Sequence, residues 1–129
     1  MSAKLLETIF YVDDEDDIRE VALMALEDVG GLKVQSFRSA REMLAGLPIS
    51  APDLLLLDVM MPDMDGPTLL AELRKRQEYA GVPAIFMTAK VQPAEISALI
   101  ACGAIAVVAK PFDPMNLADS IRDIFEDKA

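Results

Sequence analysis

The sequence predicts an α/β fold, with one doubly wound domain in which a central sheet of five parallel strands carries helices on both faces. Short apolar runs alternate with longer amphipathic stretches five times over, which is the order of successive strand–helix units. The run 54–57 consists of four leucines with no polar face, as expected of a strand that is covered on both sides. Right-handed crossovers between parallel strands then place helices on both faces of the sheet.

The predicted strands are the short apolar runs of the chain. Their bounds are 8–12, 32–37, 53–57, 83–87 and 105–109. Each has the length of an ordinary strand in a globular protein.

The first two predicted helices have recognisable ends. Apolar residues recur at helical spacing through 18–29, and Gly30 with Gly31 provides a C-terminal cap. Ser39 can cap a short helix that runs to residue 44, and Glu42 three residues later completes a capping-box pattern.

The remaining three helices are predicted from the same kinds of pattern. A leucine stripe within 69–73 marks the third helix, and residues 93–101 form the fourth, which Gly103 terminates. The fifth carries an apolar stripe through 117–125, with Pro114 at a favoured first-turn position.

The length and composition suit a single domain over residues 1–129, and we expect no output domain after it because the last predicted helix runs almost to residue 129. The chain has no histidine and one cysteine, which excludes histidine metal sites, histidine general bases and an internal disulfide. A net charge of −10 argues against direct nucleic-acid binding. No apolar run approaches a membrane span and the N-terminus lacks a signal-peptide core, so we expect a cytoplasmic protein without membrane contact.

The candidate functional residues follow the predicted strands, because ligands of open α/β sheets bind beyond the carboxyl ends of the strands. Those residues, in strand order, are Asp13, Asp14, Asp58, Thr88 and Lys110. Clustered carboxylates repel one another unless a cation lies among them, and a site of oxygen ligands suits Mg²⁺. Lysine and threonine are suitable donors to phosphoryl oxygens.

Four motifs surround these residues. They are Val-Asp-Asp-Glu at 12–15, Leu-Asp-Val-Met-Met-Pro-Asp-Met-Asp-Gly at 57–66, Met-Thr-Ala-Lys at 87–90 and Ala-Lys-Pro-Phe at 109–112. In this order and at strand ends, they resemble the receiver domain of response regulators in two-component signalling. The resemblance spans essentially the whole chain and implies a flavodoxin-like sheet with strand order 2-1-3-4-5.

The resemblance implies a metal-assisted phosphoacceptor. Asp58 would take a phosphoryl group on its carboxylate and become an aspartyl phosphate. Asp14 and Asp58 would ligate Mg²⁺, or alternatively Mn²⁺, together with the backbone carbonyl of Met60, and Asp13 would assist through water. Such an ion neutralises charge on the acceptor and phosphoryl oxygens.

The resemblance also implies roles for two donors and for partner proteins. Lys110 would pair with the phosphoryl group, the Thr88 hydroxyl would bond to it, and the Lys110–Pro111 bond would be cis. The phosphoryl donor would be a phosphohistidine on a sensor histidine kinase or a histidine phosphotransfer protein. A downstream protein would bind the face of the fourth helix, fifth strand and fifth helix. The chain would catalyse its own phosphorylation and dephosphorylation without being a conventional enzyme.

The chain departs from the family pattern at Val107, three residues before Lys110. Receiver domains usually have an aromatic residue there, which moves inward together with the threonine. Valine has no ring and is stiff at χ1, so this relay cannot operate in its usual form. Signalling through backbone shifts is one hypothesis, and a phosphate shuttle or sink that needs little conformational change is the other.

Two alternatives remain open at this stage. One is that the chain is the N-terminal receiver fragment of a longer regulator. The other, from a different class, is a small phosphatase with an aspartyl-phosphate intermediate. Such enzymes commonly place two aspartates one residue apart after the first strand, whereas Asp13 and Asp14 are adjacent. A pseudo-receiver that only binds partners is disfavoured, because every acceptor-site residue is present.

Overall fold

The computed structural model describes residues 4–48 and 50–129, and its sheet has the architecture that the sequence predicts. The strands are β1 (Thr8–Val12), β2 (Lys33–Phe37), β3 (Leu54–Asp58), β4 (Ala84–Thr88) and β5 (Ala106–Ala109). All neighbouring strands are parallel and lie in the order β2-β1-β3-β4-β5. The strand order implied by the resemblance is therefore confirmed.

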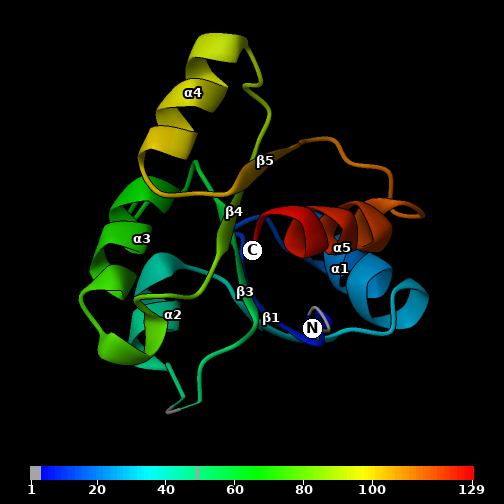
Figure 1. Cartoon of the computed structure of the whole chain (residues 1–129), viewed down its shortest axis with the longest axis horizontal. Coiled ribbons are helices and arrows are strands. Elements are labelled where there is room, and N and C mark those ends of the chain that lie inside the picture. Colours follow the sequence, from blue (N-terminus) through cyan, green and yellow to red (C-terminus); the bar gives the residue numbers. More distant parts are fainter. Residues whose placement is uncertain (1–3, 49) are drawn as a thin grey trace.

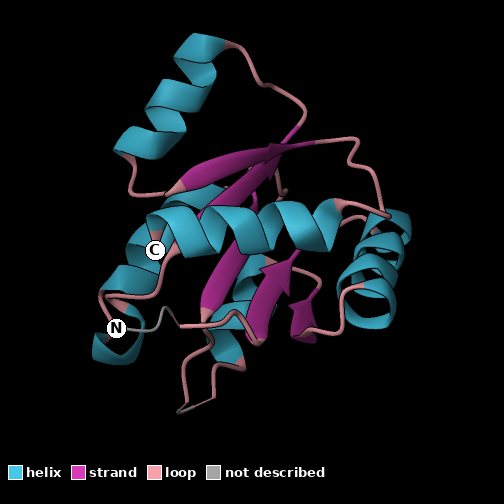
Figure 2. Cartoon of the chain, turned by 45° about the vertical axis from the view of Figure 1, so that its right-hand side comes forward, coloured by secondary structure: helices cyan, strands magenta, loops and turns pink. Residues whose placement is uncertain are grey.

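Helices cover both faces of this sheet. They are α1 (Asp16–Leu23), continued by the π-helix η1 (Met24–Val29), then α2 (Ala40–Ala45), α3 (Gly66–Arg74), the 3₁₀-helix η2 (Gln77–Tyr79), α4 (Pro93–Ala101) and α5 (Leu117–Lys128). Helices α2, α3 and α4 lie on one side of the sheet, with α1 and α5 on the other (Figure 1). Figure 2 shows the same layers with the strands in magenta between cyan helices. Within the described ranges, no helix combines the length and the apolarity needed to cross a bilayer.

The strand bounds agree with the predicted ones to within one residue at each end. The small shifts matter at two positions, because Asp58 and Thr88 become the last residues of β3 and β4. Their backbones are thus held in the sheet, while their side chains lie at its carboxyl edge.

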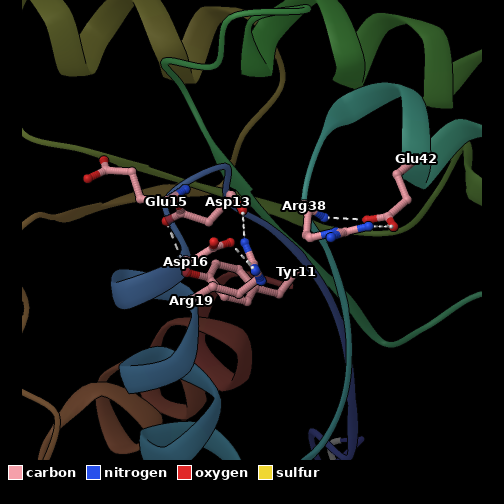
Figure 3. Close-up of polar contacts among 7 residues, drawn as sticks. All are labelled: Tyr11, Asp13, Glu15, Asp16, Arg19, Arg38 and Glu42. Carbon is pink, nitrogen blue, oxygen red and sulfur yellow. Dashed lines mark hydrogen bonds and ion pairs between the residues drawn. The ribbon is translucent and has the colours of Figure 1, made fainter.

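Three details of the helices differ from the prediction. The first helix begins at Asp16, and its last part is wound as a π-helix, with the Gly30 N–H donating to the carbonyl of Ala25. The chain leaves it at Gly31, whose φ of 71° lies in the left-handed region that glycine adopts without strain. The capping box near α2 is incomplete. Ser39 accepts the Glu42 N–H as expected, but the Glu42 carboxylate accepts the N–H of Arg38 instead of that of Ser39 (Figure 3).

The prediction that Pro114 opens the fifth helix is wrong. Helix α5 begins at Leu117, and Pro114 lies in the turn before it. The Asp113 side chain accepts the Met115 N–H at 2.9 Å, and its carbonyl accepts the Asn116 N–H at 3.0 Å. Aspartate commonly forms such local turns, and here the turn competes with the first turn of the helix.

The two faces of β3 explain why its sequence is uniformly apolar. Leu55 and Leu57 pack in the core layer beneath α2, α3 and α4, whereas Leu54 and Leu56 pack in the layer beneath α1 and α5. All four side chains are fully buried. Each buried leucine contributes roughly 1.5–3 kcal/mol of transfer free energy, so the central strand is a rigid support for Asp58 at its end.

Candidate functional site

The carboxyl ends of the central strands bring residues that are distant in sequence to one rim. Strand register places Asp58 beside Met87 and Thr88 beside Ala109. The ladder continues past the strands, because the Val59 N–H donates to the Met87 carbonyl at 3.0 Å. The Lys110 N–H likewise donates to the Thr88 carbonyl at 2.9 Å. The backbone of this rim is therefore fixed by the sheet.

Asp13, Asp14 and Asp58 form an acidic cluster on this rim. One carboxylate oxygen from each lies within 4.8 Å of the others. Asp13 is fully buried and Asp58 is 3% exposed, so water screens their mutual repulsion only weakly. Among the described residues, Asp14 Oδ1 and Asp58 Oδ2 are buried and have no hydrogen-bond partner. Two unpartnered carboxylate oxygens in one anionic cluster fit a hard divalent cation such as Mg²⁺.

Lys110 supplies a positive charge to this cluster. Its Nζ lies 2.8 Å from Asp13 Oδ2 and 3.1 Å from Asp58 Oδ1. Burial works to lower the pKa of Lys110, but the hydrogen bonds and charges of Asp13 and Asp58 outweigh it, so the pKa lies above its ordinary value. The Lys110 ammonium offsets the negative charge of one of the three carboxylates. The remaining negative charge can be neutralised by a bound cation. The Lys110–Pro111 peptide bond is cis, as the resemblance implied.

The electrostatics of Asp58 follow from its burial among other acids. Burial, followed by the charge of Asp13, raises the pKa of Asp58 to about 7, while Lys110 acts in the opposite direction. Without a bound cation, the ionised form of Asp58 is therefore poorly stabilised. A cation and a proton compete for this carboxylate, so metal binding favours the ionised, nucleophilic form.

Thr88 and Met60 complete the set of predicted site residues. Thr88 is buried, and its Oγ1 accepts the backbone N–H of Lys90 at 3.1 Å. That bond leaves the O–H of Thr88 free to donate to a phosphoryl oxygen. The Met60 side chain is 64% exposed in the loop after β3, so a metal could use only its backbone carbonyl. Both assigned roles stay predictions.

Two residues that were not predicted from the sequence hold Asp13 in place. Tyr11 Oη donates to Asp13 Oδ2 at 3.0 Å, and Arg19 Nη1 donates to the Asp13 carbonyl at 2.9 Å (Figure 3). The sequence contains one indication of the contact between Tyr11 and Asp13. Tyr11 precedes Asp13 by two residues, and the alternation of a strand puts both side chains on one face.

Comparison with known proteins identifies the family. A sequence profile described as "Response regulator receiver domain" matches residues 9–122, a span that contains the whole rim. This chain belongs to the response regulator receiver domain family. The family that the motifs predicted is thereby confirmed, and the chain is a receiver domain of two-component signalling.

Individual relatives agree with this assignment. The receiver domain is 33% identical over 117 residues to response regulator Rre1 of Synechocystis sp., covering 91% of this chain and 51% of that protein. It is 34% identical over 116 residues to regulatory protein VanRc of Enterococcus gallinarum, covering 90% of this chain and 48% of that protein. The chain thus spans about half the length of these relatives.

Solved structures show the same fold over the whole domain. The chemotaxis response regulator CheY4 of Vibrio cholerae is similar with a TM-score of 0.83 and 28% sequence identity, covering 92% of this chain and 98% of that one. A putative response regulator from Chloroflexus aurantiacus is similar with a TM-score of 0.81 and 30% identity, covering 93% of this chain and 98% of that one.

Proposed function

We propose that this receiver domain accepts a phosphoryl group on Asp58 from a phosphohistidine and passes the signal on by protein contact. The donor would be a sensor histidine kinase or a histidine phosphotransfer protein in the cytoplasm. The observation that carries the proposal is the arrangement around Asp58. Its Oδ1 contacts Lys110, its Oδ2 is buried without a partner among the residues that the structure describes, and two further carboxylates lie alongside.

The transfer step is a simple displacement. A carboxylate oxygen of Asp58 attacks phosphorus while the bond from phosphorus to the donor imidazole nitrogen breaks. The leaving imidazole keeps the electron pair, and no oxidant or reductant is required. Lys110 lies 3.1 Å from the acceptor carboxylate, so a small movement of Nζ brings it to a phosphoryl oxygen. The Thr88 hydroxyl donates to a second phosphoryl oxygen.

The acidic cluster would hold the metal that this step needs. Asp14 and Asp58 would ligate Mg²⁺, with the Met60 carbonyl as a further ligand and Asp13 acting through water. Mn²⁺ would substitute for it. When bound, the ion neutralises charge on the acceptor and phosphoryl oxygens. The unpartnered oxygens of Asp14 and Asp58 are what support this assignment.

The surface that binds a downstream protein would be formed by α4, β5 and α5. Strand β5 is at the edge of the sheet, so residues from both flanking helices can contact a partner together with it. Val107 lies on β5 beside Phe86, where it has no ring to move. Without a ring at this position, the domain would signal through small backbone shifts of this face, or it would act as a phosphate shuttle that needs little conformational change. The same acceptor chemistry serves a receiver that stands alone and one that is the N-terminal part of a longer regulator.

The test is phosphorylation by a small donor. The protein is incubated with acetyl phosphate and Mg²⁺, and intact-mass spectrometry follows the gain of phosphoryl groups. Wild type should gain one group and Asp58→Asn none, whereas Asp28→Asn, which alters an exposed acid on η1, should behave like wild type. Wild-type labelling of Asp58→Asn would contradict the proposal. Repeated turnover of varied phosphate esters would instead support the phosphatase alternative.

A further inference from the structure

The carboxylate of Asp13 is held by donors from three parts of the chain. Its Oδ2 accepts hydrogen bonds from Tyr11 Oη at 3.0 Å and from Lys110 Nζ at 2.8 Å. Its Oδ1 accepts the backbone N–H of Glu15 at 3.0 Å. Because Asp13 is fully buried, these protein donors and not water determine its orientation.

Tyr11 is itself immobile. Its ring is fully buried on β1, in the core layer beneath α1 and α5. Burial raises the pKa of Tyr11 far above its ordinary value, and the charge of Asp13 adds to this effect, so the hydroxyl remains a donor at every physiological pH. Figure 3 shows the phenol beside the Asp13 carboxylate, with Arg19 next to it. Arg19 binds the Asp13 carbonyl, so the side chain and the backbone of Asp13 are both fixed.

We propose that Tyr11 is a positioning residue of the acceptor site, whose hydroxyl sets the orientation of Asp13 and, through it, the placement of Lys110. This inference rests on the proposed function. Lys110 is shared between Asp13 at 2.8 Å and Asp58 at 3.1 Å. Without the tyrosine hydroxyl, Asp13 Oδ2 would have Lys110 as its remaining partner. That oxygen would then draw the ammonium away from Asp58, and the carboxylate would be oriented by Lys110 and the Glu15 N–H without the phenol.

The variant Tyr11→Phe tests this idea, because it keeps the packed ring and removes only the hydroxyl. Tyr79→Phe is the matched control. Tyr79 is also buried, but its hydroxyl donates to the Pro48 carbonyl at 2.7 Å, away from the rim. Mg²⁺ affinity is measured by titration calorimetry, with circular dichroism as the check on folding. Loss of a group that orients a metal-site carboxylate should weaken Mg²⁺ binding about tenfold in Tyr11→Phe. Binding by Tyr79→Phe should match wild type.

Tyrosine emission gives a second readout, which reports on the contact between the Tyr11 hydroxyl and the Asp13 carboxylate. The chain has two tyrosines and no tryptophan, so Tyr11 is the sole emitter in Tyr79→Phe. A phenol hydrogen-bonded to a carboxylate is quenched, and the quenching depends on the charge of that carboxylate. Addition of Mg²⁺ to Tyr79→Phe should therefore change the emission intensity at the same concentrations that saturate binding.

Three outcomes would overturn the inference. One is wild-type Mg²⁺ affinity in folded Tyr11→Phe, and another is saturation of Tyr79→Phe without a change in emission. If Tyr11→Phe does not fold, the emission titration decides alone. The third is a wild-type protein that binds no Mg²⁺, which would overturn the proposed function as well. The first two outcomes leave the proposed function standing, so the two kinds of failure are distinguishable.

Discussion

Replacing Asp58 with asparagine should stabilise the metal-free protein at neutral and alkaline pH. The pKa of Asp58 is raised from 3.8 to about 7, chiefly by burial and then by the charge of Asp13. The folded state therefore holds this proton more tightly than the unfolded state does. The associated stability is fully present below about pH 4 and is lost as the pH rises through about 7. Asparagine has a similar shape and no proton to lose, so its contribution to stability does not change with pH.

The size of the effect follows from the same numbers. A pKa change of this size corresponds to at most about 4 kcal/mol. Buried protein sites respond to charge with an effective dielectric constant well above that of dry protein, which reduces this figure, so we expect Asp58→Asn to exceed wild type by about 1–2 kcal/mol at pH 8. At pH 4, close to the ordinary pKa of 3.8, the acid is protonated in the folded state and about half protonated in the unfolded state, so most of the difference in the free energy of unfolding should have disappeared.

The assay is urea unfolding from pH 4 to pH 8.5 in the presence of a chelator. Wild type and Asp58→Asn are compared at each pH, with Asp28→Asn as the surface control. Mg²⁺ should then stabilise wild type and leave Asp58→Asn nearly unchanged, because a ligand stabilises only the folded state that binds it. Parallel pH curves for wild type and Asp58→Asn would contradict the raised pKa of Asp58, and equal stabilisation of both by Mg²⁺ would contradict its role as a metal ligand.

Two other predictions use paired variants. A Cβ on Gly66 would lie 2.6 Å from the Asp58 carbonyl oxygen, so Gly66→Ala should destabilise the fold by about 1–3 kcal/mol in urea unfolding and weaken Mg²⁺ binding in calorimetry. Gly81→Ala, with no atom within 4 Å of its added Cβ, should be near neutral, and equal effects of the two would argue against this explanation. Leu56→Ala removes a fully buried side chain from β3 and should cost about 2–5 kcal/mol in the same assay. Leu5→Ala, at a side chain that is 65% exposed, should cost little, and a small loss for Leu56→Ala would contradict the packing described for β3.

Much of the fold is predictable because its signals are local. The leucine run of β3 needs apolar cover on both faces, and that need alone identifies a central buried strand. The order of strands in the sheet is a different matter. It depends on where each crossover passes, which no local pattern specifies, and it was obtained from the family resemblance. The π-helical winding of η1 was also out of reach, because an apolar stripe does not distinguish its hydrogen bonds from those of an α-helix.

The sequence predicts which residues meet at the candidate site, but it does not predict which of their atoms are in contact. Asp14, Asp58 and Lys110 each follow a predicted strand, so their meeting at one rim follows from the parallel sheet. Which oxygen Lys110 contacts, and which oxygens lack partners, depends on side-chain orientation. Tyr11 shows the limit most clearly. Within an apolar strand a tyrosine is most simply interpreted as core. Its spacing of two residues from Asp13 permits a contact on the same face, and the hydroxyl contact itself indicates the further role.

Pro114 illustrates a conflict between two local preferences. Proline favours the first turn of a helix, but the Asp113 side chain binds the backbone two residues later and completes a turn first. Both preferences are visible in the sequence. Their relative strength depends on where α5 must pack, and that is decided by the core beneath α1 and α5.

The most direct test of the central claim is to locate the phosphoryl group. The protein is phosphorylated by a small donor with Mg²⁺, the acyl phosphate is reduced with borohydride, and tandem mass spectrometry of the peptides finds the altered residue. We expect modification at Asp58, in the peptide that contains β3. Modification at another aspartate, or none in folded protein saturated with Mg²⁺, would contradict it.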